Sequence, residues 1–199
     1  MSIRQVGPLR AVGPVLRSLV FLLLLAAVAP VAFAQMDFTA ARRDLAVGST
    51  PRTIAAGDLN GDGKQDLAVV AGSSNAVSIL LNVGGGVFRA AAQVPTGDSP
   101  NAAVLARFNS DAFLDMVVAT YLANQIQIYA GNGSGGFLAP TSISTGPGSG
   151  PWALAVLDWN QDTRNDLAVL LYGTGRYRLY TGNGTGGVSL QGEYLVAEG

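Results

Sequence analysis

Short apolar segments, separated by glycine-rich or acidic turns, make up most of the chain. Segment 67–71 (LAVVA) is apolar at every position, as expected of a strand that is buried on both faces. Segment 53–58 precedes an acidic loop, and segments 77–82 and 88–94 are separated by a run of glycines. Beyond the first 34 residues, no segment keeps the period of 3.6 residues that predicts an amphipathic helix. The pattern therefore predicts an all-β fold of short strands.

The same arrangement of strands and polar residues occurs three times, with successive spacings of 49 and 51 residues. Four columns keep this spacing: Pro51, Pro100 and Pro151; Asn60, Asn109 and Asn160; Asp62, Asp111 and Asp162; and Asp66, Asp115 and Asp166. Four short strands in a unit of about 50 residues indicate a β-propeller blade, which buries its apolar faces by stacking on neighbouring blades. A β-sandwich is the alternative, but the repetition of specific polar residues favours the propeller.

The repeat spacing divides the chain into approximate units at 38–86, 87–136 and 137–187, with a partial fourth unit at 188–199. Propellers typically contain about 4 to 8 blades, so three units predict an incomplete ring or an arc. Two explanations remain open at this point. The chain is a fragment of a longer protein, or several copies assemble as a homo-oligomer that completes the ring.

Residues 1–34 have the three parts of a secretory signal peptide. They contain three arginines, an apolar stretch at 19–29 and the small-residue sequence AFA at 32–34. A retained membrane anchor is the alternative, but the apolar stretch is shorter than the roughly 20 residues that a membrane span needs. Cleavage would leave residues 35–199 as a secreted, periplasmic or cell-surface protein without an integral membrane span.

Composition excludes several classes of function. Loss of the three leader arginines from a total of 12 basic residues leaves 9 against 13 acidic ones, a net charge of −4. This balance does not indicate a nucleic-acid partner. The sequence contains no cysteine and no histidine, which excludes disulfides, zinc sites of thiolate or imidazole type, and Ser-His-Asp or Cys-His catalysis. No carboxylate pair outside the acidic loops is indicated as a catalytic pair, so we expect a protein that is not an enzyme.

The first acidic loop, residues 58–66 (loop one), presents oxygen atoms at alternate positions, with Gly61 and Gly63 allowing a tight coil. Calcium prefers such hard oxygen ligands. The candidate ligands are Asp58, Asn60, Asp62, the backbone carbonyl of Lys64, and Asp66. The loop is not an EF-hand, because Val69 stands where the closing glutamate is required and strands are predicted on both sides.

The other two acidic loops differ from the first. Loop three, residues 158–166, keeps its candidate ligands, but Thr163 replaces a glycine, so its site is expected to be weaker or differently coiled. These ligands are Asp158, Asn160, Asp162, the backbone carbonyl of Arg164, and Asp166. Loop two, residues 107–115, has a cation at the first ligand position and is expected to bind no metal. It contains Arg107, Asn109, Asp111 and Asp115, and we expect Arg107 to pair with the two aspartates in place of an ion.

Loops one and three resemble those of the FG-GAP or VCBS repeat family, the units of integrin alpha-chain propellers and of many secreted bacterial proteins. The matching residues are Asp58, Asn60, Asp62, Gly63, Asp66 and Leu67 in the first copy, and Asp158, Asn160, Asp162, Asp166 and Leu167 in the third. The stretch GGFLAP at 135–140 resembles the motif that names the family. The resemblance covers about residues 38–199. It implies that each loop joins the first two strands of a blade and binds calcium, and that the opposite propeller face meets ligands.

These observations predict about two structural calcium ions, which would stabilise a chain that has no disulfides. The expected role is adhesion or recognition of an extracellular protein or glycan. A lectin-like propeller and a non-catalytic targeting module of a larger secreted enzyme are the alternatives. The candidate ligand contacts at the rim are Tyr121, Tyr172, Arg176 and Tyr177, although these side chains would also suit packing between blades. Trp152 is expected in the core, and Trp159 at a loop tip.

Overall fold

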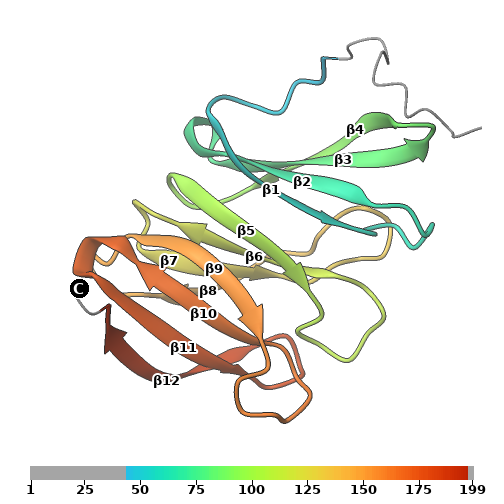
Figure 1. Cartoon of the computed structure of the whole chain (residues 1–199). Coiled ribbons are helices and arrows are strands. Elements are labelled where there is room, and N and C mark those ends of the chain that lie inside the picture. Colours follow the sequence, from blue (N-terminus) through green and yellow to red (C-terminus); the bar gives the residue numbers. More distant parts are fainter. Residues whose placement is uncertain (1–43, 197–199) are drawn as a thin grey trace, which may run out of the picture. The chain divides into compact units, whose positions relative to one another are not determined.

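The computed structural model describes residues 44–196, so the predicted signal peptide at 1–34 lies outside the described residues. In the described part, three antiparallel sheets of four strands follow one another along the chain (Figure 1). The first sheet contains β1 (Pro51–Gly57), β2 (Asp66–Ala71), β3 (Ala76–Gly84) and β4 (Val87–Pro95). The second contains β5 (Pro100–Ala106), β6 (Asp115–Thr120), β7 (Gln125–Tyr129) and β8 (Thr141–Ser144). The third contains β9 (Pro151–Leu157), β10 (Asp166–Leu171), β11 (Arg176–Gly182) and β12 (Val188–Leu195).

Strands in each sheet pair in chain order, so each sheet is a simple antiparallel meander. The apolar segment predicted at 67–71 forms most of β2, which lies between β1 and β3. A short 3-10 turn, Gly72–Ser74, follows it and ends at Asn75, whose φ of 48° is left-handed. Asparagine is one of the few non-glycine residues that tolerates this conformation. The all-β prediction and the four-stranded blades are confirmed.

Neighbouring sheets pack through two hydrophobic clusters. The cluster between the first and second sheets includes Val70, Ile79, Met116, Val118 and Tyr129. The cluster between the second and third includes Val117, Ile126, Leu167, Val169 and Tyr180. Each buried strand contributes side chains to both faces of its sheet, because successive side chains point in opposite directions. This is why β2 and β6 are apolar at consecutive positions.

The three sheets do not close on one another. At one repeat position, Val70 and Ala119 in the first two sheets are fully buried, whereas Leu170 in the third remains partly exposed. Tyr177 and Leu179, on the same face of the third sheet, are also partly exposed. The prediction of an incomplete ring or arc agrees with this uncovered face.

The sheets do not begin and end at the boundaries of the repeat units that the sequence predicted. The boundary at 86/87 separates β4 from the sheet to which it belongs, and segment 188–199 contributes β12 to the third sheet rather than beginning a fourth. Sequence spacing fixes the length of the repeat, but not which four strands share hydrogen bonds.

No helix within residues 44–196 is long and apolar enough to cross a membrane.

Candidate functional site

One buried carboxylate in each sheet ties the acidic loop to the end of the third strand. Asp66, Asp115 and Asp166 begin β2, β6 and β10 and are almost completely buried. Their Oδ2 atoms accept the backbone N–H of Leu59 at 2.9 Å, Phe108 at 2.8 Å and Trp159 at 3.2 Å. Their Oδ1 atoms accept the backbone N–H of Asn82 at 2.8 Å, Gly131 at 3.0 Å and Gly182 at 2.9 Å. Each carboxylate thus satisfies backbone donors that the fold removes from water, a role that the sequence analysis missed.

Loop one is coiled around the side chain of Asp58. The Oδ1 atom of Asp58 accepts the backbone N–H of Gly61 at 2.8 Å, and its Oδ2 atom accepts that of Gly63, also at 2.8 Å. The Gly63 N–H is the main reason that the pKa of Asp58 is lowered. The Lys64 ammonium, 2.9 Å from Asp62, likewise lowers the pKa of Asp62. Asn60 accepts the Asp62 N–H at 3.0 Å, so the three candidate side chains are gathered at one place.

Loop three repeats this coil although it lacks both glycines. The Asp162 N–H donates to Asp158 at 3.1 Å and to Asn160 at 3.0 Å, as in loop one. Gln161 and Thr163 take the places of Gly61 and Gly63 and adopt φ values of 62° and 69°. A left-handed conformation is unfavourable for a β-branched residue such as threonine. The expectation of a different coil in loop three is therefore wrong: the geometry is kept, with backbone strain at Thr163.

Loop two adopts a different structure. No residue from 107 to 115 has a positive φ, so the two left-handed positions of the other loops are missing. The amide of Asn109 donates to Asp115 Oδ1 at 3.3 Å, and the Asp115 carboxylate otherwise accepts backbone N–H groups. The expected pairing of Arg107 with Asp111 and Asp115 is wrong, because no ion pair of Arg107 occurs within residues 44–196. Backbone N–H groups donate to both oxygens of the Asp115 carboxylate, and the Arg107 side chain is exposed.

The candidate ligands of loops one and three suit a hard divalent cation by donor type, because all are oxygens. Asp58, Asn60 and Asp62 lie in a coil that already directs them to one place. Asp66 is turned toward the backbone, although each of its oxygens has a further lone pair. Over the described range 44–196, no three acidic side chains converge as a metal-binding group. The candidate ligands thus suit a cation by donor type alone, and the closing aspartate is held by the fold.

A second candidate site lies at the other end of the strands. Tyr121 and Tyr172 follow β6 and β10, whereas loops two and three precede the same strands. Trp152, at the start of β9, joins them, with its ring centroid 5.6 Å from that of Tyr121 and 5.3 Å from that of Tyr172. Tyr172 is 66% exposed and Trp152 is 41% exposed. These three residues are called the aromatic cluster below. Tyr121 is half-buried, and the exposed rings of Trp152 and Tyr172 are of the kind that favours binding.

The position of Trp152 results from a β-bulge. Pairing with β10 shifts between Ala153 and Pro151, so Trp152 has no partner in the ladder. The same shift occurs after Pro51 and Pro100, leaving Arg52 and Asn101 unpaired. A bulge re-aims the side chain of the extra residue, and Trp152 is 41% exposed, so its expected place in the core is wrong. The repeated proline was the available signal, since proline within a sheet is typical of an edge or bulge.

The three bulge residues form a hydrogen-bonded row across the sheets. The Arg52 Nη1 atom donates to Asn101 Oδ1 at 2.8 Å, and Asn101 Nδ2 donates to the Trp152 carbonyl at 2.8 Å. They line a hollow of about 410 Å³ together with Thr53. This row places a cation and an amide beside the aromatic cluster.

The other two candidate rim residues belong to a separate group. Tyr177 stacks on Tyr194, with ring centroids 5.1 Å apart, and Arg176 pairs with Glu193 at 3.0 Å. Trp159 is 42% exposed and lies near the base of loop three, where its backbone N–H donates to Asp166, so its expected place at the loop tip is wrong. The structure thus brings Tyr121 and Tyr172 together, but gives Arg176 and Tyr177 other partners.

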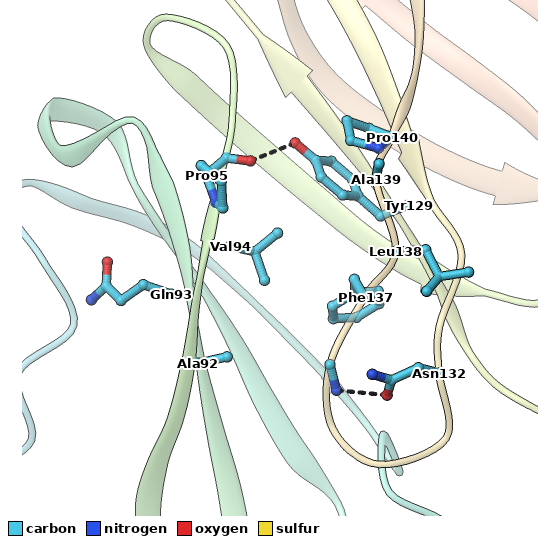
Figure 2. Close-up of a pocket in the computed structure, with 11 residues that line it drawn as sticks. Ala92, Gln93, Val94, Pro95, Tyr129, Asn132, Phe137, Leu138, Ala139 and Pro140 are labelled. Atoms are coloured by element: carbon cyan, nitrogen blue, oxygen red, sulfur yellow. Dashed lines mark hydrogen bonds between the residues drawn. The ribbon is translucent and has the colours of Figure 1, made fainter.

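An apolar hollow of about 370 Å³ separates β4 from residues 137–140 (Figure 2). It forms because β8 has only four residues, so the stretch before it leaves the sheet. Tyr129 closes one end, where its hydroxyl donates to the Pro95 carbonyl at 2.8 Å and so ties the first sheet to the second. Val94 and Phe137 line the interior.

Comparison with known proteins is consistent with this architecture. The chain is similar to a protein in the crystal structure of BBS1N in complex with ARL6DN, soaked with mercury, with a TM-score of 0.51 and 18% identity. The match covers 75% of this chain and 46% of that one, so this chain spans less than half of its length. At such identity the likeness shows the fold alone. No curated protein matches the chain.

The family comparison is more specific. The FG-GAP-like repeat family matches twice, at residues 58–118 and 107–169. The two matches overlap and together span more than half of the chain. Each begins at the first ligand position of an acidic loop and runs into the second strand of the next sheet. The chain therefore belongs to the FG-GAP-like repeat family.

Proposed function

We propose that the chain is an exported recognition scaffold, which binds an extracellular protein or glycan through the aromatic cluster and is stabilised by calcium. The single observation that carries this proposal is the aromatic cluster, with Trp152 and Tyr172 exposed, beside the Arg52 guanidinium. Aromatic rings provide contact area with little loss of conformational entropy, while the exposed guanidinium of Arg52 provides polar contacts. The lack of histidine and cysteine favours binding over catalysis.

A glycan ligand is supported by the arrangement of the two exposed rings. Trp152 and Tyr172 are tilted by 36° to each other, with ring centroids 5.3 Å apart, and both side chains are exposed. Exposed aromatic rings stack on the apolar side of a sugar, whose hydroxyl groups would meet the exposed guanidinium of Arg52. A protein ligand would use the same rings as anchors in a larger contact.

Calcium would be held by the coils of loops one and three. Asp58, Asn60 and Asp62, with the Lys64 carbonyl, are the proposed ligands in loop one, and the buried Asp66 would close the site. Loop three would use Asp158, Asn160, Asp162, the Arg164 carbonyl and Asp166. Bound calcium would screen the repulsion between these carboxylates and link each loop to its sheet. The proposal that calcium binds these loops does not depend on the aromatic cluster.

The recognition proposal is tested by binding of the whole chain to a glycan array and to a panel of purified extracellular proteins. Trp152→Ala and Tyr172→Ala are expected to weaken binding at least tenfold. Trp159→Ala is the matched control, because Trp159 is equally exposed at the opposite end of the strands. Binding that survives both cluster substitutions, or that Trp159→Ala also removes, would show that the cluster is not the binding site.

A further inference from the structure

Two arginines line one hollow between loops two and three. Arg107 lies at the start of loop two, and Arg164 near the end of loop three. The hollow has a volume of about 380 Å³, and its polar lining also includes Ser110 and Asn165. None of the residues that line it is acidic. The hollow therefore presents hydrogen-bond donors and positive charge to any group that enters it.

The backbone around the hollow is fixed by contacts between the sheets. The Asn165 amide donates to the Arg107 carbonyl at 2.9 Å, and the Gly186 N–H donates to the Phe108 carbonyl at 2.9 Å. A side chain at Gly184 would come within 3.3 Å of the Arg164 side chain, so Arg164 lies along this turn. These contacts hold the two loops together without using either guanidinium group of the hollow.

Neither arginine has a close carboxylate partner in the described chain. Arg107 has no ion pair there, and Arg164 reaches Asp162 only at 3.9 Å. By contrast, Lys64 pairs with Asp62 at 2.9 Å in loop one. Two cations at one hollow repel each other, and an anion between them would remove that repulsion.

The repeat provides an internal comparison. At the junction of the first and second sheets, Asp58 and Phe113 occupy the positions of Arg107 and Arg164. The Phe113 ring lies against Gly133, as Arg164 lies against Gly184. The equivalent junction therefore has an acid and an aromatic ring. The pair of arginines is specific to the second junction.

We propose that Arg107 and Arg164 form a binding site for an oxyanion of the sulfate or phosphate type. Each guanidinium is planar and donates paired N–H groups that match two oxygens of such an anion. The acidic groups on the same loops, Asp111, Asp158 and Asp162, oppose the anion, and binding must draw Arg164 away from Asp162. The site is separate from the aromatic cluster and does not depend on the recognition proposal.

The test is calorimetric titration of the whole chain with inorganic phosphate and with sulfate, at constant ionic strength and without added calcium. Saturable binding is expected, with at least tenfold weaker affinity in Arg107→Gln and in Arg164→Gln. Lys64→Gln is the matched control for loss of one positive charge on an acidic loop, and it should leave the affinity within about twofold. Circular dichroism would verify that each variant is folded, which is expected because both arginines are exposed.

A sulfated oligosaccharide and a phosphorylated peptide, titrated in the same way, distinguish an ester group from a free ion. Tighter binding of either ester than of the inorganic ion would identify the natural source, and equal binding would identify the free ion. The proposal is overturned if the folded chain binds neither inorganic anion. It is also overturned if the arginine variants bind as the unmodified chain does, or if Lys64→Gln weakens binding equally.

Discussion

The Oδ2 atom of Asp115 accepts the backbone N–H of Phe108 at 2.8 Å, while its Oδ1 atom accepts that of Gly131 at 3.0 Å. A single buried side chain thus joins the start of loop two to the end of the third strand of its sheet. Asp66 and Asp166 make the same two contacts in the other sheets. The repeated aspartate is part of the fold whether or not its loop binds a metal.

Removal of the Asp115 carboxylate should therefore destabilise the chain even in a chelator. Asp115→Ala leaves buried N–H groups without acceptors, and each such group costs about 1–3 kcal/mol. We expect a loss of about 3–5 kcal/mol in the free energy of unfolding, measured by urea denaturation with EDTA present. Asp111→Ala, in the same loop but exposed, should cost less than about 1 kcal/mol. Equal losses in the two variants would contradict the structural role of Asp115.

Backbone strain in loop three predicts a stabilising substitution. Thr163 has a φ of 69°, and a left-handed conformation costs a non-glycine residue roughly 1–2 kcal/mol. Thr163→Gly should stabilise the chain by up to about 1 kcal/mol, because the entropy of glycine offsets part of the gain.

The reciprocal change, Gly63→Thr, should destabilise loop one by about 1–2 kcal/mol. Gly63 has a φ of 80° and open space around its Cβ position, so any loss comes from the backbone and not from a clash. Thermal melts of both variants in EDTA provide the measurement. A destabilised Thr163→Gly would show that the threonine side chain contributes a contact that outweighs the strain.

Much of this fold was predictable from the sequence, for local reasons. The apolar run at 67–71 and the glycines around it fixed the second strand and its turns, and the repeat spacing fixed the number of sheets. The positions of Arg52, Asn101 and Trp152 were not predictable in the same way. They depend on a one-residue shift of strand pairing, which alternation of side chains does not reveal.

The candidate site was also predictable only in part. Residue type and spacing were enough to predict that Asp58, Asn60 and Asp62 share one coil, because the coil is set by neighbours in the sequence. The contacts of Asp66 with Asn82, and the exposure of Arg107, depend on residues that are distant in the chain. Sequence spacing alone could not show which carboxylate oxygens accept backbone N–H groups.

Tyr129 gives the fold a dependence on alkaline pH. Burial raises the pKa of Tyr129 to about 12, above the value of about 10 for an exposed tyrosine. A raised pKa means that the folded state keeps the proton longer than the unfolded state. The stabilisation from neutral Tyr129 is therefore complete below pH 10 and is lost as the pH rises toward 12.

Tyr129→Phe should remove this part of the pH dependence. At neutral pH the substitution should cost about 1 kcal/mol, because the hydroxyl no longer donates to the Pro95 carbonyl. Denaturant unfolding of both proteins between pH 8 and about 11.5 provides the measurement. If the two stability profiles stay parallel over this range, Tyr129 is not the group responsible.

The most direct test of the calcium-stabilised scaffold is calorimetric titration of the whole chain with calcium, combined with thermal melts. We predict saturation at about two ions per chain, with one ion lost in Asp58→Ala, one lost in Asp158→Ala and none lost in Arg107→Gln. Calcium at 100 times its dissociation constant should then stabilise the fold by about 2.7 kcal/mol per independent site. No saturable binding by a folded chain, or binding that survives Asp58→Ala and Asp158→Ala together, would contradict the account.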